Sequence, residues 1–218
     1  MASRMAILTY NPAMFRVPDE ETARRIILTP DGEQSTAERW ERETPYLTDL
    51  LGPLVQAGPG QTIVDLGCGI GRMSKALIER FGCRVLGVDI SPDMRAFAAG
   101  YVDSEAFSVV SSEKFAALAA GGLQVDGAIS VWVLQHCLSA HEEVARLRSV
   151  LRPGARLGVV NTIGRVVPTV EKTWASDGVD VRGLLNETFA TVQEGDLDAG
   201  VVGDLVAHGT FWGVYEKA

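Results

Sequence analysis

The chain has 218 residues, of which 46% are hydrophobic and 22% charged, a composition that predicts a packed globular protein and excludes extensive disorder. Its formal net charge of −8 disfavours a nucleic acid or an acidic carrier protein as partner, because an acidic surface repels anions and only the pair Arg24-Arg25 is locally basic. Its three cysteines have neither paired nor zinc-type spacing, so we expect no disulfide framework and no bound metal.

The N-terminal part of the chain, residues 1–33, is predicted to be largely irregular, with one short helix at 20–28. Residues 1–15 lack the basic start and apolar block of a signal peptide, and no run of about 18 apolar residues predicts a membrane span. We therefore expect a cytoplasmic protein without membrane contact. A helix is predicted to begin after Ser35, because Ser35 and Glu38 have the S-x-x-E spacing of a capping box.

This helix contains a proline, Pro45, which is expected to break or kink it before it resumes over 46–55. The Gly-Pro-Gly segment at 58–60 then interrupts the chain. We therefore expect residues 1–57 to form an N-terminal extension and helical lid, and residues 58–218 to form the main domain.

From residue 61 onward, short apolar strands alternate with helical stretches. Strands are predicted at 62–66, 84–89, 106–110, 126–132 and 156–161. Helices are predicted between them at 71–81, 92–101, 113–120 and 140–151, the last one closed by Arg152-Pro153-Gly154. Such alternation predicts a parallel sheet with helices on both faces.

The alternation is less regular after Asn161. A helix is predicted at 181–188, and strands are predicted at 189–193 and 210–215. The last strand is short and ends the chain, so we expect it to be an antiparallel edge strand.

A glycine-rich segment follows the first predicted strand. Asp65 is followed by Gly67, Gly69 and Gly71, and a helix starts at once. Glycines let the backbone turn sharply and approach a ligand, and the helix N-terminus offers free N–H groups. A dinucleotide fingerprint would need its third glycine where Arg72 stands. A tight turn without any ligand is the alternative interpretation.

This acid-x-G-x-G-x-G segment resembles the first motif of the class I S-adenosylmethionine-dependent methyltransferases. The resemblance implies an α/β, Rossmann-like, doubly wound sheet of seven strands, mostly parallel with an antiparallel final strand. It implies that Asp65 and the glycine loop line the methionine end of the cofactor and that Asp89, after the second strand, binds the ribose hydroxyls. Asp89 alternatively caps the helix that starts at Ser91–Pro92. Further cofactor contacts are expected from Cys68, Arg72, Ile90 and Met94.

The third strand departs from the family pattern, which often has an Asp that contacts the adenine amino group. The matching position here is Ser112, with Glu113 beside it, and either side chain is a candidate for this contact. Helix capping by Ser111 or Ser112 is an equally good interpretation.

After the fourth strand, the resemblance places Val131 and Trp132 beside the sulfonium, and Gln135 and His136 at the acceptor site. An aromatic face stabilises a cation, although Trp132 also suits plain core packing. His136 is a candidate general base because its ordinary pKa lies near neutrality; a structural histidine is the alternative. Cys137 is expected to be packing rather than a nucleophile.

Other candidates come from the irregular parts of the chain. Candidates for the acceptor site are Asn161, Arg165, Trp174 and His208, and candidates for a lid are Tyr10, Phe15, Arg39 and Trp40. In related enzymes an Arg or aromatic of the lid reaches the methionine carboxylate, and Arg39 and Trp40 suit that role. The alternative for both is an ordinary amphipathic helix face.

We therefore expect an S-adenosylmethionine-dependent methyltransferase that acts on the oxygen or nitrogen of a small molecule, as a monomer or homodimer. Three rivals remain: a module that only binds S-adenosylmethionine, a nicotinamide-dependent oxidoreductase, and an aminopropyl transferase using decarboxylated cofactor. The third of these would carry extra active-site carboxylates, which the sequence does not indicate.

Overall fold

The computed structural model describes residues 9–32 and 34–218; residues 1–8 and 33 of the N-terminal extension lie outside the described part. The strands are β1 (Thr62–Leu66), β2 (Arg84–Val88), β3 (Phe107–Val110), β4 (Val125–Val131), β5 (Leu151–Thr162), β6 (Ala190–Gly195) and β7 (Thr210–Glu216). The helices are η1 (Pro12–Phe15), α1 (Glu20–Ile27), α2 (Thr36–Leu54), α3 (Arg72–Phe81), α4 (Pro92–Val102), α5 (Ser112–Ala120), α6 (Ala140–Val150), α7 (Val181–Thr188), α8 (Ala199–Val202) and α9 (Asp204–Gly209).

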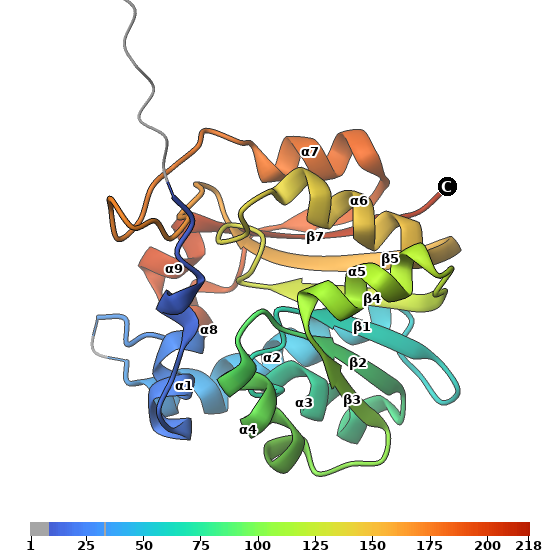
Figure 1. Cartoon of the computed structure of the whole chain (residues 1–218), viewed down its shortest axis with the longest axis horizontal. Coiled ribbons are helices and arrows are strands. Elements are labelled where there is room, and N and C mark those ends of the chain that lie inside the picture. Colours follow the sequence, from blue (N-terminus) through green and yellow to red (C-terminus); the bar gives the residue numbers. More distant parts are fainter. Residues whose placement is uncertain (1–8, 33) are drawn as a thin grey trace, which may run out of the picture.

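The strands form one seven-stranded sheet in the order β3-β2-β1-β4-β5-β7-β6 (Figure 1). Neighbours from β3 to β5 pair in parallel, and β7 pairs antiparallel with both β5 and β6. The predicted Rossmann-like α/β fold with an antiparallel final strand is therefore confirmed.

Two apolar layers cover the sheet, and the period-2 alternation of each strand decides which side chain enters which layer. Val64 and Leu66 of β1 pack with α5, α6 and α7, whereas Ile63 packs on the other face with α2, α3, α8 and α9. In β7, Tyr215 joins the first layer and Trp212 the second. Both layers leave the carboxyl ends of the parallel strands available for a site.

The position of β7 differs from the expected one. It is not at an edge, because six of its seven residues are buried and it lies between β5 and β6. The edge strand is β6, whose first four residues are exposed. β7 has apolar residues on both faces, and helices packed on the sheet cover both of them.

The long helix α2 begins as predicted and runs on without the break that is one of the two expectations at Pro45. Ser35 Oγ accepts from the Glu38 N–H at 3.3 Å, and Glu38 Oε2 accepts from the Ser35 N–H at 2.8 Å, which confirms the capping box. The helix is not broken at Pro45 but continues to Leu54. Leu47 and Leu51 are fully buried against the sheet, and this packing maintains the helix beyond the missing proline N–H.

Some helical boundaries also differ from the prediction. Segment 152–154, expected to close α6, belongs to β5, and α6 ends at Val150. The short elements η1, α8 and α9 had no clear sequence signal. None of the helices in 9–32 and 34–218 combines the length and apolarity needed to cross a membrane.

Candidate active site

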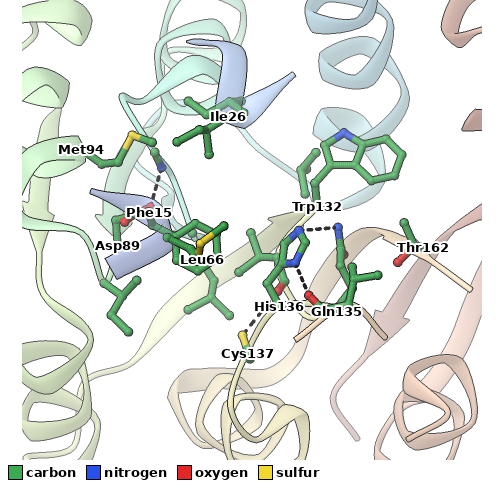
Figure 2. Close-up of a pocket in the computed structure, with 18 of the residues that line it drawn as sticks. Phe15, Ile26, Leu66, Asp89, Met94, Trp132, Gln135, His136, Cys137 and Thr162 are labelled. Atoms are coloured by element: carbon green, nitrogen blue, oxygen red, sulfur yellow. Dashed lines mark hydrogen bonds between the residues drawn. The ribbon is translucent and has the colours of Figure 1, made fainter. Parts of the chain in front are cut away.

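A large cavity opens at the carboxyl ends of β1, β2 and β4. Its volume is about 1020 Å³, at the upper end of the roughly 300–1,000 Å³ of sites for drug-sized ligands. Figure 2 shows Asp89 and Met94 at one end, Trp132, Gln135 and His136 at the other, and Phe15 and Leu66 between them. This arrangement gives the cavity two distinct halves.

The glycine loop after β1 forms a wall of the first half through its backbone. Gly67, Gly69 and Gly71 have φ values of +73°, +56° and +88°, the left-handed region that favours glycine. The N–H groups of Gly67 and Cys68 donate to the Val88 carbonyl at 2.7 and 3.0 Å. Gly67 and Gly69 line the cavity, whereas Gly71 and Cys68 are buried outside its lining.

Substituting Gly67 tests this loop. In Gly67→Ala the new Cβ would lie 2.2 Å from Val133 Cγ2 on a left-handed backbone. We expect the free energy of unfolding, measured by urea denaturation, to fall by about 2–5 kcal/mol. Gly100→Ala is the control, because its Cβ meets nothing within 4 Å and alanine favours a helix. Equal stability of the two variants would contradict the loop geometry.

Asp89 lies between the glycine loop and α4, and it lines the cavity. Its carboxylate accepts from the Gly69 N–H and from the Ser91 N–H, both at 2.8 Å. Burial raises its pKa, and these two hydrogen bonds oppose that shift. Because a carboxylate has about four acceptor sites, it can also accept from ligand hydroxyls. Ser91, rather than Asp89, caps α4 by accepting from the Met94 N–H.

Asp65 lies behind the glycine loop and outside the cavity lining. Its buried carboxylate accepts from Ser74 Oγ at 2.7 Å, and burial raises its pKa to about 6. In this position Asp65 anchors the first turn of α3 to the end of β1. The motif residue thus supports the loop from behind, and its direct contact with a ligand stays a prediction.

A buried charge cluster joins α2 to α3. Arg39 lines the cavity; its Nε donates to Glu43 Oε1 at 2.5 Å and its Nη1 to the Thr29 carbonyl at 2.6 Å. Arg72 is buried outside the lining, and burial lowers its pKa to about 10. Trp40 also lies outside the lining, where its indole Nε1 donates to the Tyr101 hydroxyl at 3.2 Å. Of the two predicted lid residues, Arg39 therefore lies in the cavity lining, whereas Trp40 packs outside it beside Tyr101.

The end of the cavity near β2 and β3 contains Ile90, Met94 and Ser112. Glu113 lies outside this lining, and Ser111 caps α5 by accepting from the Lys114 N–H at 3.2 Å. The capping role therefore belongs to Ser111, which leaves the Ser112 side chain available to a ligand.

The segment after β4 forms the wall between the two halves, with Val131, Trp132 and Gln135 in the lining. Trp132 has φ = +63°, an uncommon conformation for a bulky residue, and its N–H donates to the Val160 carbonyl at 2.8 Å. Gln135 is buried, and its N–H donates to Asn161 Oδ1 at 3.0 Å. This sharp turn directs the residues after β4 into the cavity.

His136 has a defined protonation state in the second half of the cavity. Its Nδ1 lies 2.7 Å from the Val166 carbonyl, which can only accept, so Nδ1 carries the proton. Nε2 therefore has a lone pair, and Gln135 Nε2 lies 3.4 Å from it. Burial lowers the His136 pKa, which keeps the ring neutral at pH 7. Phe15 and Trp174 flank the ring, with centroids 5.8 and 5.2 Å away.

Two residues predicted at the acceptor site, Asn161 and Arg165, lie behind the His136 segment and outside the cavity lining. Both are buried, and Asn161 is bonded to the Gln135 backbone. The Arg165 guanidinium donates to the Leu134 carbonyl, to the Cys137 carbonyl at 2.6 Å and to Asp177 Oδ2 at 2.8 Å. Its donors are thus engaged within the protein, and its role here is to hold the segment that carries His136.

The remaining candidates divide between cavity and surface. Tyr10, Phe15 and Trp174 line the cavity, whereas His208 is exposed and lies outside the lining. Cys137 lines the cavity, and burial raises its pKa to about 12, so it is a neutral thiol. The sequence reasoning missed the Val166 carbonyl and Asp177, because neither a backbone group nor an isolated surface Asp carries a sequence signal.

Replacement of Arg165 tests its positioning role. Arg165→Met leaves two carbonyls without their donor, so we expect the free energy of unfolding to fall by about 3 kcal/mol. We also expect ¹⁵N NMR to show a mixture of His136 tautomers in place of Nδ1–H; the chain has only three histidines to assign. Arg182→Met, which breaks an exposed ion pair, is the control. An unchanged tautomer in Arg165→Met would contradict the role.

A segment from the N-terminal part, residues 9–17, spans the cavity mouth between two distant elements. The Asn11 N–H donates to the Pro168 carbonyl at 3.0 Å, and the Val17 N–H donates to Asp93 Oδ2 at 3.1 Å. In Figure 1 it is the dark blue chain beside α1 and α9. It places Tyr10 and Phe15 over the second half of the cavity.

Comparison with known sequences gives one family and several relatives. Residues 63–154 match the family described as methyltransferase domain. The chain is 25% identical over 174 residues to the O-methyltransferase resE of Aspergillus sclerotiorum, covering 73% of this chain and 66% of that protein. It is 32% identical over 105 residues to the N-demethylindolmycin N-methyltransferase of Streptomyces griseus, covering 46% of this chain and 44% of that protein. The chain thus spans two thirds or less of these relatives.

Solved structures share the fold at lower sequence identity. The N-methyltransferase NodS of Bradyrhizobium japonicum, in complex with S-adenosyl-L-homocysteine, has a TM-score of 0.65 at 15% identity, covering 90% of this chain and 97% of that one. The magnesium protoporphyrin IX methyltransferase of Synechocystis, with bound SAH, has a TM-score of 0.63 at 18% identity, covering 91% and 94%. At this identity the likeness concerns the fold.

Proposed function

Because the chain belongs to the class I S-adenosylmethionine-dependent methyltransferases, we propose that it methylates a hydroxyl oxygen of a small molecule by in-line transfer. The observation that carries this proposal is His136, a neutral imidazole in the cavity lining with Nδ1–H bonded to a backbone carbonyl and an Nε2 lone pair whose neighbouring donor, Gln135 Nε2, lies at the long distance of 3.4 Å. A hydroxyl acceptor must lose a proton, and this nitrogen is placed to take it.

The first half of the cavity fits the cofactor. Asp89 offers a carboxylate to ribose hydroxyls, the Gly67–Gly69 backbone permits close approach, and Arg39 brings a guanidinium toward the cavity. Ser112 lies at the end of β3, where we propose the adenine contact. When bound, the cofactor supplies an electrophilic methyl group and leaves as S-adenosylhomocysteine.

The protein contributes mainly position and desolvation to this chemistry. The wall after β4, with Trp132 and Gln135, separates the cofactor half from the acceptor half. Orientation of two reactants can contribute about 7–11 kcal/mol to a barrier. We propose that segment 9–17 closes over both ligands and excludes water; within residues 1–57 it acts as the lid, whereas α2 packs against the sheet of the domain of residues 58–218.

His136 then acts on the acceptor alone. Its Nε2 accepts the hydroxyl proton, the ring becomes imidazolium, and the Val166 carbonyl continues to accept from Nδ1–H. Because burial opposes this charge, the proton is expected to pass on to solvent once the product leaves.

Calorimetry and product analysis test the proposal. S-adenosylmethionine should bind the purified protein and NAD should not. Incubation with S-adenosylmethionine and a set of phenols and aliphatic alcohols should form S-adenosylhomocysteine and a methyl ether, detected by mass spectrometry. Binding of the cofactor without any methyl ether across the set would contradict O-methylation and favour a binding module.

A further inference from the structure

The acceptor half of the cavity contains buried polar atoms that have no partner in residues 9–32 and 34–218. In this half they are Gln135 Oε1 and Glu143 Oε2, and both residues line the cavity; Trp132 Nε1, in the wall between the two halves, is an unpaired donor. Gln135 is only 2% exposed, and its Nε2 faces His136 Nε2, which assigns the unpaired position to the oxygen. Both orphans are hydrogen-bond acceptors, and a buried acceptor without a partner is costly. Donor groups of a ligand in this cavity can serve as their partners.

The charges around the cavity have one dominant sign. The carboxylates in its lining are Asp31, Asp89, Glu142 and Glu143. Among the described lining residues the one guanidinium is Arg39, which is paired with Glu43. Arg165 is engaged behind the wall, and His136 is neutral. An acceptor with a carboxylate or phosphate would find no free cation in this lining, whereas a cation would be attracted.

Glu143 is the carboxylate best placed for this purpose. It forms an ion pair with Arg146, whose Nη1 donates to Oε1 at 2.5 Å; this contact orients the side chain and leaves Oε2 without a partner among the described residues. Burial raises the pKa of both Tyr10 and Cys137, two other residues of the cavity lining, and the Glu143 charge raises both further. The carboxylate thus acts on the same space that His136 and Phe15 border.

The shape of this half suits a flat, apolar body. The Phe15 and Trp174 rings both pack near the His136 ring, with centroids 5.8 and 5.2 Å from it. At the mouth, Leu138 and Leu205 line the cavity although their side chains are 64% and 75% exposed. Exposed apolar groups at the rim of a site favour a ligand with an apolar surface.

We propose that the methyl acceptor is an aromatic hydroxy compound that carries a protonated amine, with Glu143 and Gln135 as the residues that receive its N–H groups. This inference rests on the proposed function and names its substrate class. Glu143 acts in recognition, His136 acts on the hydroxyl, and the aromatic rings hold the body of the acceptor between them.

Three phenols of nearly equal shape test the inference by calorimetric binding to protein saturated with S-adenosylhomocysteine. They are tyramine, 4-ethylphenol and 3-(4-hydroxyphenyl)propionate, which are cationic, neutral and anionic at pH 7.5. We expect tyramine to bind about tenfold more tightly than 4-ethylphenol and the propionate to bind more weakly than either. In Glu143→Gln the tyramine advantage should disappear, while 4-ethylphenol affinity stays the same.

Glu187→Gln on α7 is the matched control, because it removes the same charge from an exposed position outside the cavity and should keep the tyramine preference. Retention of that preference in Glu143→Gln, or tighter binding of the neutral or anionic phenol, overturns the inference. So does the absence of binding by all three when S-adenosylhomocysteine binds. Failure of S-adenosylhomocysteine itself to bind would instead overturn the proposed function, and this inference with it.

Discussion

Asp89→Asn is expected to weaken S-adenosylmethionine binding about 10- to 100-fold. The substitution keeps the shape of the side chain but removes its charge and turns an NH₂ group toward an N–H donor or a ligand hydroxyl. In the wild type both carboxylate oxygens already hold backbone N–H groups, of Gly69 and Ser91, at 2.8 Å. Loss of the carboxylate charge therefore weakens both the contact with the ligand and the hydrogen bonds that hold the loop. Calorimetric titration measures the affinity.

The control for this experiment is Glu79→Gln, which removes one charge from an exposed position on α3 and should bind the cofactor as the wild type does. Circular dichroism checks that Asp89→Asn is folded. If the folded variant binds S-adenosylmethionine with wild-type affinity, Asp89 is not a cofactor contact.

The second large effect concerns catalysis. His136→Asn is expected to lower kcat about 10²- to 10⁴-fold with an unchanged affinity for S-adenosylmethionine, because His136 belongs to the acceptor half of the cavity. His141→Asn on the exposed face of α6 should have neither effect. Single-turnover measurements on protein saturated with S-adenosylmethionine give the rate of methyl transfer separately from cofactor binding. A wild-type rate for His136→Asn would remove its role as the base.

The lowered pKa of His136 predicts how the reaction rate and the free energy of unfolding depend on pH. Burial lowers the His136 pKa from its usual 6.5, so the neutral base persists below pH 6.5 and the rate falls only at lower pH. Stability follows the same sign: as pH falls through 6.5 the unfolded chain binds a proton that the native ring does not, so the free energy of unfolding decreases. His136→Asn should lack this contribution in urea titrations between pH 7 and pH 5.

The sequence by itself determined the elements whose signals are local. These signals depend on neighbours within a few residues. They are the Ser35–Glu38 spacing, the strand–helix alternation from residue 61 and the glycines that need a left-handed backbone. The position of Asp89 beside the loop follows as well, because parallel strands end at one sheet edge.

Only the tertiary structure decided where side chains at those positions point and what completes the cavity. Asp65 faces Ser74, and Arg165 faces backbone carbonyls about 30 residues earlier in the chain, so both leave the cavity lining. The protonation of His136 depends on the Val166 carbonyl. Glu143 lies in the cavity lining because α6 packs beside the segment that carries His136. These contacts join segments that are far apart in sequence, and a local pattern carries no information about such pairs until packing brings them together.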